Sequence, residues 1–387
     1  MLNKLKKILW EKCDQKKPHK DNLYNHKDIS FFAICKQFCA HFPQIIHTFV
    51  VMKALYTHIV PLLEHLADNL HRVFTEEVIG EACEQNPWFA PHDVEFALEA
   101  IRDEFLDTNK IAKWLDTHHI TPPTEPKKVG VICAGNIPLA GFFDVMCVLA
   151  AGHRCFVKPS SKDTPLMMAL CGFLRGCGAP IELLHDLQEP DAVIASGSDV
   201  AMSAIGATYG SIHTLLRGHR SSVAVLNGGE TEEEILGLGE DMFRYNSLGC
   251  RNITLLWLPE GYNLERLIHS LQPKREVVSP KYVGGYRQAK ATAILTGESV
   301  VDGGFFLLQQ KKSFPTRLTQ VNFATYRTTG EVEEWLSAND VHIQCVATSA
   351  HTPLSHPRST LFGRAQRPTL CDWPDGVDVL EWLKNRM

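Results

Sequence analysis

The sequence lacks the features of a membrane or secreted protein. Its 387 residues contain no run of about 18 apolar residues, so no segment is long enough to span a bilayer. Near the basic N-terminus, the apolar stretch 8–10 is too short to be the core of a signal peptide. The net charge of −5 leaves no excess of positive charge, so we expect no nucleic-acid partner. These absences favour a cytoplasmic protein.

Metal sites and a disulfide framework are not indicated either. Twelve cysteines without a secretion signal are typical of reduced thiols. Cys35 and Cys39 lie four residues apart with His41 nearby, but no second pair completes a zinc site. A structural helix face explains these three residues better, and we predict no metal.

Helical periodicity dominates residues 1–128. At the N-terminus Leu2, Leu5 and Leu9 share one helical face, which fits a membrane-surface helix or a helix docked on its own protein. The second interpretation is favoured because amphipathic surface helices are commoner. A clean apolar stripe further along predicts another helix, and its members are Val94, Leu98, Ile101 and Phe105. The proline-rich segment 121–126 is the clearest linker.

From residue 129 onward, apolar strands alternate with helices, which is typical of βαβ units and a parallel, doubly wound sheet. The strand candidates of this first region are 129–133, 154–158, 191–195 and 222–226, and its helix candidates are 139–151, 164–174 and 200–205. A second α/β region continues to about residue 364, with strand candidates at 253–258, 292–296, 305–309, 319–324 and 342–347. Residues 375–384 are predicted to form a closing helix.

Loops of small and polar residues follow three strand candidates of the first region, at 134–138, 158–163 and 196–199. None has the G-x-G-x-x-G spacing of an ordinary dinucleotide turn. Singly, each also fits a turn followed by a helix cap. Parallel sheets bind ligands beyond the carboxyl ends of their strands, so three such loops in succession favour a ligand site.

The stretch 246–252, Asn-Ser-Leu-Gly-Cys-Arg-Asn, directly precedes a strand candidate of the second region. Gly249 allows the backbone at Cys250 to approach a substrate closely. Arg251 favours the thiolate, which is the nucleophilic form of cysteine. Free cysteine is more often a buried small apolar residue, so the upstream loops are needed to support a catalytic role.

Together, these loops and the cysteine block resemble the aldehyde dehydrogenase superfamily. Within it they most resemble the acyl-CoA reductases related to the fatty-acid reductase of bacterial luminescence. Residues 129–163 (VGVICAGNIPLAGFFDVMCVLAAGHRCFVKPSSKD) carry the strongest likeness, and blocks 221–234, 248–252 and 362–378 support it. Several matching blocks in the right order are far more specific than one motif.

The resemblance implies an α/β fold with two doubly wound parallel-sheet domains and a helical N-terminal part. Residues 129–227 would form the NAD(P)-binding domain and 228–370 the catalytic domain. The helical part, 1–128, would pack on the cofactor domain. Relatives assemble through a hairpin and a C-terminal segment, which match 117–128 and 371–387, so a homo-oligomer is expected.

Residue by residue, the resemblance also implies a site. Cys250 matches the catalytic cysteine, and Asn136 matches the asparagine whose amide donates to the oxyanion. The loop Lys158, Ser160 and Ser161 matches the cofactor-ribose loop, in which the lysine meets the adenosine ribose. The turn beside the pyrophosphate matches Gly197 and Ser198.

Two departures from the family pattern bear on the reaction. The E-L-G-G block of hydrolytic relatives begins with the glutamate that activates water, and 226–229 reads Leu-Asn-Gly-Gly. Because Leu226 cannot act as a base, exchange of a thioester with a thiol such as coenzyme A becomes the expected chemistry. The second departure is the lack of an E-x-F-x-x-P segment, so the residue that positions the nicotinamide ribose stays unassigned.

We therefore predict an NAD(P)H-dependent acyl-CoA reductase that forms a fatty aldehyde through a thioester on Cys250. One alternative is an acyl-phosphate reductase of the same superfamily. Another is a non-catalytic acyl-binding or scaffold subunit, against which the surviving pair of Cys250 and Asn136 argues.

The ribose loop also predicts the cofactor. NAD-selective relatives have a glutamate three residues after the lysine, where this sequence has Ser161. Serine leaves room for a 2′-phosphate, and Lys158 and Lys162 supply positive charge, so we expect NADPH, with NADH as the alternative. The measurement is kcat/KM for both cofactors in wild type and in Ser161→Glu, which should shift the ratio toward NADH. A wild type that prefers NADH would contradict this interpretation of the loop.

Overall fold

The computed structural model describes residues 59–387 except 122, 185–187 and 353. Predictions made for residues 1–58, including the N-terminal amphipathic helix and the cysteine–histidine cluster, lie outside the described residues. No described helix is long and apolar enough to cross a membrane. The nine cysteines of the described part are free thiols.

Helices make up the described N-terminal part, as expected. They are residues 59–73, α4 (Glu76–Gln85), α5 (Pro91–Phe105) and α6 (Thr108–His118). Helix α5 starts at Pro91, where the missing N–H removes no helical hydrogen bond. Its predicted stripe is confirmed, because Val94, Ile101 and Phe105 are buried in the first core.

The first sheet has five parallel strands in the order β3-β2-β1-β4-β5. Its strands are β1 (Lys128–Ile132), β2 (Arg154–Lys158), β3 (Ile181–Leu183), β4 (Ala192–Ser196) and β5 (His213–Arg217). The chain runs outward from β1 to β3 and returns to the other side for β4, so the topological switch point lies between β1 and β4. The edge strands β3 and β5 were not predicted, because they are short and mostly half-exposed and lack a clear apolar run.

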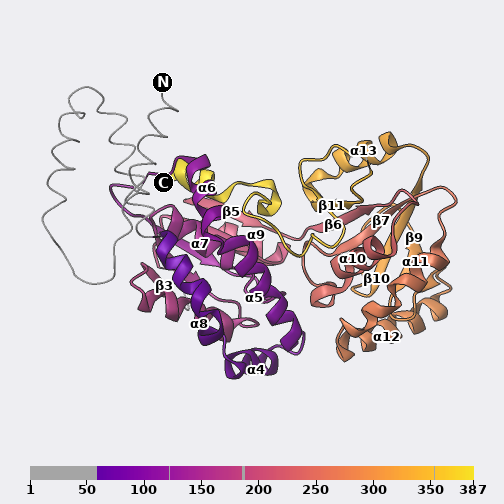
Figure 1. The fold of residues 1–387 in the computed structure, drawn as a ribbon, viewed down its shortest axis with the longest axis horizontal. Helices are drawn as coiled ribbons and strands as arrows, with labels where there is room; N and C mark the ends of the chain where they lie inside the picture. The colour runs from indigo at the N-terminus through magenta and orange to yellow at the C-terminus, as the bar shows by residue number, and fades with distance from the viewer. Residues whose placement is uncertain (1–58, 122, 185–187, 353) are drawn as a thin grey trace, which may run out of the picture. The chain divides into compact units, whose positions relative to one another are not determined.

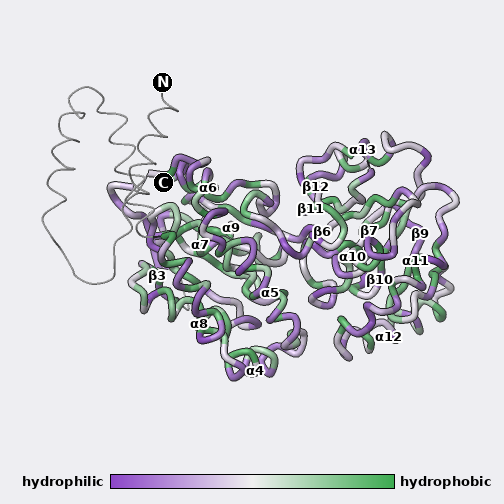
Figure 2. The backbone as a smooth tube through the Cα atoms, in the orientation of Figure 1, coloured by the Kyte–Doolittle hydropathy of each residue, from purple (hydrophilic) through white to green (hydrophobic). Residues whose placement is uncertain are grey.

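Helices cover both faces of this sheet, as a doubly wound fold requires (Figure 1). They are α7 (Phe142–Ala150), α8 (Thr164–Gly176) and α9 (Asp199–Tyr209). Helices α7 and α8 share a core with Val129 and Val157, and α9 packs with Val193 on the opposite face. Figure 2 shows that hydrophobic and hydrophilic residues alternate along the backbone of these elements.

The second sheet has seven strands in the order β12-β11-β6-β7-β10-β9-β8. They are β6 (Ser221–Val225), β7 (Ile253–Pro259), β8 (Val301–Asp302), β9 (Leu307–Gln310), β10 (Gln320–Tyr326), β11 (Ile343–Thr348) and β12 (Ser359–Leu361). All neighbours are parallel except β8 and β9. The covering helices are α10 (Glu232–Phe243), α11 (Leu264–Leu271) and α12 (Pro280–Thr296) on one face and α13 (Thr329–Ala338) on the other (Figure 1).

Two sequence predictions in this region are wrong. The strand at 222–226 was assigned to the first domain, but β6 pairs with β7 and β11, so the first α/β region ends before residue 221 and not at 227. The sequence could not show this, because a fully buried strand has the same run of apolar residues whichever sheet it joins. The strand at 292–296 is the last part of α12, where Ile294 and Leu295 are 71% and 87% exposed. Short apolar runs are ambiguous between helix and strand.

The C-terminal segment closes the fold of its own chain. Helix α14 (Val379–Arg386) buries Val379, Leu380 and Leu383 in the core that α7 shares. Between α6 and β1, the described residues of the expected hairpin form no pair of strands, so the hairpin predicted at 117–128 is absent from the described part. A homo-oligomer stays a prediction.

An ion pair fixes the start of α14. His118 Nε2 lies 2.7 Å from Asp378 Oδ2, and its Nδ1 lies 2.7 Å from the Trp114 carbonyl, so the protonated ring satisfies both acceptors. The hydrogen bond to Asp378 raises the pKa of His118 above its ordinary value. For Asp378, burial alone would raise the pKa, but the hydrogen bond from His118 outweighs it and the pKa of Asp378 is lowered.

These shifts predict a pH-dependent contribution to stability. The His118 contribution is present below about pH 6.5 and is lost as pH rises through the raised pKa. The Asp378 contribution is lost in acid. Asp378→Asn, which can still cap α14, should lower the free energy of unfolding by about 1–3 kcal/mol near pH 6 and by less near pH 9. Urea denaturation at both pH values measures this, and equal losses would contradict the ion pair.

Candidate functional site

The candidate site lies where edges of the two sheets meet. Loops leave the carboxyl ends of β1, β2 and β4 in the first sheet, and Cys250 lies just before the amino end of β7 in the second. Asn136, on the loop after β1, donates its Nδ2 to the Leu248 carbonyl at 2.6 Å. The structure therefore brings Asn136 to the cysteine loop. An amide nitrogen carries two hydrogens, so this bond leaves one for an acceptor near Cys250.

Two glycines allow the loops to come this close. A Cβ on Gly249 would lie 3.1 Å from Asn252 Oδ1 and 3.4 Å from Ile137 Cγ2. On Gly135, a Cβ would lie 2.4 Å from Ser160 Oγ, a distance that carbon atoms do not adopt without movement of the neighbour. The loops after β1 and β2 and the cysteine loop thus form one packed group.

Asn252 organises the turn that carries the nucleophile. Its Nδ2 donates to the carbonyls of Asp241 and Arg244, both at 3.0 Å, which satisfies orphan acceptors at the end of α10. Its Oδ1 accepts from the Gly249 N–H at 2.7 Å. Asn252 is fully buried, so one side chain ties the helix end to the residue before Cys250. The sequence placed Asn252 in the cysteine block but assigned it no role.

Opposing charges act on Cys250. The residue has exposed surface, but protein atoms packed around its sulfur raise the pKa of the thiol. Arg251 lowers this pKa, Asp375 raises it, and Arg217 lowers it. The predicted effect of Arg251 therefore has the expected sign, but burial outweighs it and Cys250 is a thiol at neutral pH.

The C-terminal segment contributes to the same region. Arg251 Nη2 donates to the Asp372 carbonyl at 2.7 Å, and Asp375 Oδ2 forms an ion pair with Arg220 at 3.1 Å. The Asp375 carboxylate is mostly buried, and the residue has a left-handed backbone conformation with φ of 58°. The likeness of the 362–378 block suggested no role for these contacts.

A buried ion pair anchors the end of β5. Arg217 donates from Nη1 and Nη2 to the two carboxylate oxygens of Asp144, at 2.9 and 2.8 Å, and both side chains are buried. Asp144 lies on α7, so the pair links the carboxyl edge of the sheet to a covering helix. Sequence analysis missed it because the partners are 73 residues apart, and the likeness of block 129–163 gave Asp144 no role.

The predicted cofactor residues flank the switch point of the first sheet. Lys158 ends β2, Ser160 is half-buried, and Ser161 is exposed. Across the switch point, Gly197 follows β4 and Ser198 caps α9 by accepting from the Ala201 N–H at 3.3 Å. Small, partly exposed residues and the start of α9 at the switch point of a parallel sheet fit a dinucleotide.

Side chains at the end of α4 support the backbone of the ribose loop. Gln85 Nε2 donates to the Ser161 carbonyl at 2.8 Å, and Asn86 Nδ2 donates to the Lys162 carbonyl at 3.1 Å. Both residues hold the backbone of the loop, so the side chains of Ser161 and Lys162 remain at the surface. Contacts between such distant segments leave no signal in a single sequence.

Asp163 stands at the start of α8, but its side chain does not cap that helix. Its Oδ2 accepts from the Leu139 N–H at 2.9 Å, and Oδ1 has no partner. Leu139 has φ of 54°, so this bond stabilises a left-handed residue three positions after Asn136. Burial raises the pKa of Asp163 to about 8. The carboxyl group therefore joins the ribose loop to the asparagine loop.

Comparisons with known proteins identify the fold. The structure aligns with an NAD-dependent benzaldehyde dehydrogenase from Corynebacterium glutamicum with a TM-score of 0.56, at 15% identity over 79% of this chain and 80% of that one. An NAD+ complex of an aldehyde dehydrogenase from Bacillus cereus aligns with a TM-score of 0.55, at 16% identity over 79% and 75% of the two chains. The chain has the aldehyde dehydrogenase fold. The fold class predicted from the sequence is confirmed.

Sequence comparison finds a distant relative over part of the chain. The long-chain acyl-protein thioester reductase of Aliivibrio fischeri is 22% identical over 215 residues, which are 49% of this chain and 45% of that protein. The chain thus matches less than half of that relative's length. No model of a known protein family matches the sequence.

Within this aldehyde dehydrogenase fold, the assignment of Leu226 to the position of the water-activating glutamate is wrong. Leu226 follows β6, and its N–H donates to the Trp257 carbonyl near the far end of β7. At about 3.3 Å per residue, this places it roughly 15 Å from the amino end of β7, where Cys250 lies. Leu226 is fully buried in the second core. The match of residues 226–229 to the E-L-G-G block was misleading, because a pair of glycines follows many buried strands.

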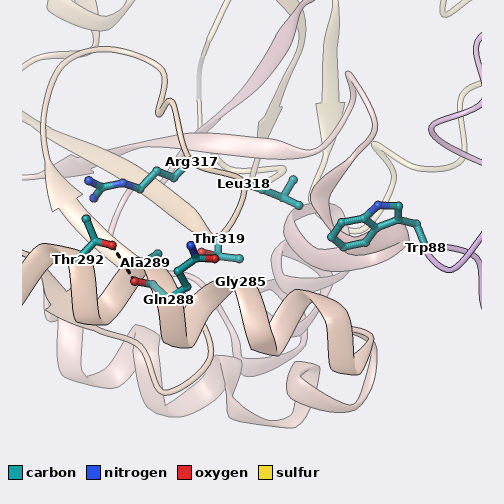
Figure 3. Close-up of a pocket in the computed structure, with 8 residues that line it drawn as sticks. All are labelled: Trp88, Gly285, Gln288, Ala289, Thr292, Arg317, Leu318 and Thr319. Carbon is teal, nitrogen blue, oxygen red and sulfur yellow. Dashed lines mark hydrogen bonds between the residues drawn. The ribbon is translucent and has the colours of Figure 1, made fainter.

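A groove of about 280 Å³ lies beside α12 (Figure 3). Its floor is one face of α12, its wall is the loop before β10, and Trp88 forms one end; the lining residues are Trp88, Gly285, Gln288, Ala289, Thr292, Arg317, Leu318 and Thr319. Strands β10 and β7 are parallel neighbours, so the groove opens at the sheet edge that carries Cys250. None of the predicted site residues lines it.

The position of Asp163 leads to a stability prediction. Between its ordinary pKa and about 8, the folded protein holds a proton that the unfolded chain has released, so stability falls as pH rises. Asp163→Asn keeps the acceptor for Leu139 and removes the charge. It should raise the free energy of unfolding by about 1–3 kcal/mol near pH 8 and have little effect near pH 5.

Chemical denaturation at the two pH values measures this difference. Asp68→Asn, which removes an exposed carboxylate, is the matched control and should change stability little at either pH. An Asp163→Asn variant that is less stable than wild type near pH 8 would show that the native carboxyl group is ionised.

Proposed function

We propose that this chain reduces an acyl thioester to an aldehyde with NAD(P)H, through a covalent thioester on Cys250. The observation that carries the proposal is the contact of the Asn136 amide with the loop of Cys250, inside an aldehyde dehydrogenase fold. The name of the Aliivibrio fischeri relative, an acyl-protein thioester reductase, supports reduction at the acyl level.

The first step is attack of the Cys250 thiolate on the acyl carbonyl, which releases the carrier thiol. Arg251 and Arg217 stabilise the thiolate against burial. The Asn136 amide, which keeps one free hydrogen, and the Cys250 backbone N–H would stabilise the tetrahedral oxyanion, because hydrogen-bond donors beside the nucleophile favour the charge that develops there. The second step collapses the reduced adduct on Cys250 to aldehyde and thiolate.

Five residues would hold the cofactor: Lys158, Ser160 and Ser161 on the ribose side and Gly197 and Ser198 at the pyrophosphate. Bound NAD(P)H supplies the hydride that reduces the acyl group. Ser161 is exposed and uncharged, which leaves room for a 2′-phosphate and supports NADPH over NADH. The helix start capped by Ser198 favours the negative charge of the pyrophosphate.

The carrier of the acyl group has two candidates. Coenzyme A follows from the resemblance of the sequence, and a protein thioester follows from the name of the relative. An acyl phosphate is the remaining alternative. Hydrolysis is disfavoured because the carboxylate that acts on Cys250, that of Asp375, is paired with Arg220.

The nucleophile is tested by labelling. Cys250→Ala should abolish both covalent labelling by radioactive acyl-CoA and NAD(P)H-dependent aldehyde formation, because Cys250 lies on the loop that Asn136 contacts. Cys371→Ala, which removes another exposed cysteine, is the control and should retain both. Labelling of the Cys250→Ala variant at a different cysteine would show that the assignment is wrong. Wild-type rates with acyl-CoA, acyl-protein thioester and acyl phosphate distinguish the carriers.

A further inference from the structure

Three consecutive residues before Cys250 have a left-handed backbone. Tyr245, Asn246 and Ser247 have φ of 56°, 55° and 59°, and none is glycine. For such residues this conformation costs roughly 1–2 kcal/mol each, and less for asparagine. A run of three is therefore maintained by contacts of the side chains and not by the freedom of the backbone.

Asn246 makes the contacts that reach furthest. It is fully buried. Its Nδ2 donates to the Trp88 carbonyl at 3.0 Å, and its Oδ1 accepts from the Ser279 N–H at 2.7 Å. These partners are 158 and 33 residues away in the sequence. One side chain therefore joins the cysteine loop to the segment after α4 and to the start of α12.

The other two residues of the turn are held by different contacts. Ser247 Oγ donates to the Met242 carbonyl at 2.8 Å, at the end of the preceding helix. The Tyr245 ring packs edge-on against Phe96, with ring centroids 6.1 Å apart. The Tyr245 backbone also bonds to the Asp93 carboxylate, and the Ser247 hydroxyl interacts with Tyr282. Of the three residues, Asn246 is the one whose side chain bonds two distant segments at once.

The turn lies next to the reacting groups. Leu248, two residues after Asn246, presents the carbonyl that accepts from Asn136, and Cys250 follows two residues later. A displacement of the turn would move the thiol relative to the oxyanion donor. Strained backbone that the surrounding structure over-determines is concentrated at functional sites, where it provides preorganisation.

We propose that Asn246 is a positioning residue for Cys250, holding the left-handed turn so that the thiol faces Asn136. Trp88 also forms one end of the groove beside α12, so the same side chain fixes that end (Figure 3). The kinetic part of the test rests on the proposed function, whereas the chemical part does not.

The principal variant is Asn246→Gly, which keeps the left-handed backbone accessible and removes both long-range hydrogen bonds. Turnover of acyl thioester should fall by at least about tenfold in kcat with a smaller change in KM, because the thiol is misplaced. Alkylation of Cys250 by iodoacetamide, followed by mass spectrometry of its peptide, should become faster near neutral pH. A loosened turn relieves the burial that raises the pKa of the thiol, so the pH profile should shift downward.

The matched control is Ser247→Gly. It changes a residue with the same backbone conformation and removes the bond to Met242 and the contact with Tyr282, while both long-range bonds of Asn246 remain. Its alkylation profile and kcat should stay within about twofold of wild type. Both variants are measured well below their unfolding temperatures, because unfolded protein would lower turnover and would also expose the thiol to alkylation.

A second pair of variants tests the bond itself. Ser279 has φ of −70°, which proline adopts, so Ser279→Pro removes the N–H that Asn246 accepts. Ser279→Ala keeps the N–H and removes only the cap of α12. The proline should reproduce part of the Asn246→Gly effect, the alanine should not, and the double variant should show no further loss.

The proposal is wrong if Asn246→Gly leaves the alkylation profile of Cys250 unchanged. If wild type reduces no acyl thioester, the proposed function fails, but the alkylation profile still decides the role of Asn246. Additive losses in the double variant would show that Asn246 and Ser279 act independently, which also contradicts the proposal.

Discussion

A single hydrogen bond, from the Asn136 amide to the Leu248 carbonyl, joins the carboxyl edge of one parallel sheet to the amino edge of the other. Every residue of the candidate site is placed relative to this junction. The loops that follow parallel strands lie at one edge of the sheet, so the loops after β1, β2 and β4 all lie on the side of the first sheet that faces the cysteine loop. Gly135 and Gly249 then set the spacing, because a Cβ at either position would meet a neighbouring loop.

Buried polar side chains hold the junction in place. Asp163 binds the loop of Asn136, Asn252 binds the turn before Cys250, and Arg217 is paired with Asp144. Removing such groups from water is costly, so they are weak sources of net stability. Their partners are backbone groups or charges on distant segments, and this requirement selects one arrangement of the loops. We interpret the buried polar network as the device that specifies the geometry of the site.

The nucleophile shows why position matters more than local sequence. Arg251 adjoins Cys250 in the chain, yet burial outweighs its charge and the pKa of the thiol is raised. Arg217 and Asp375 act on the same sulfur from other segments, with opposite signs. The fraction of thiolate therefore depends on how several elements meet, and the buried, strained turn at Asn246 is the part of the chain that sets this placement.

The sequence by itself determined the fold class, most strands and helices, and the blocks that contain Asn136 and Cys250, because periodicity and turn chemistry are local properties. The sequence assigned β6 to the wrong sheet and predicted a strand where α12 ends. It also matched Leu226 to a catalytic position, although Leu226 is distant from Cys250. Burial leaves the same apolar pattern whichever sheet a strand joins. Only the tertiary structure decided that Asp163 binds Leu139 and that Asn246 binds Trp88, because these contacts join segments whose proximity no local pattern records.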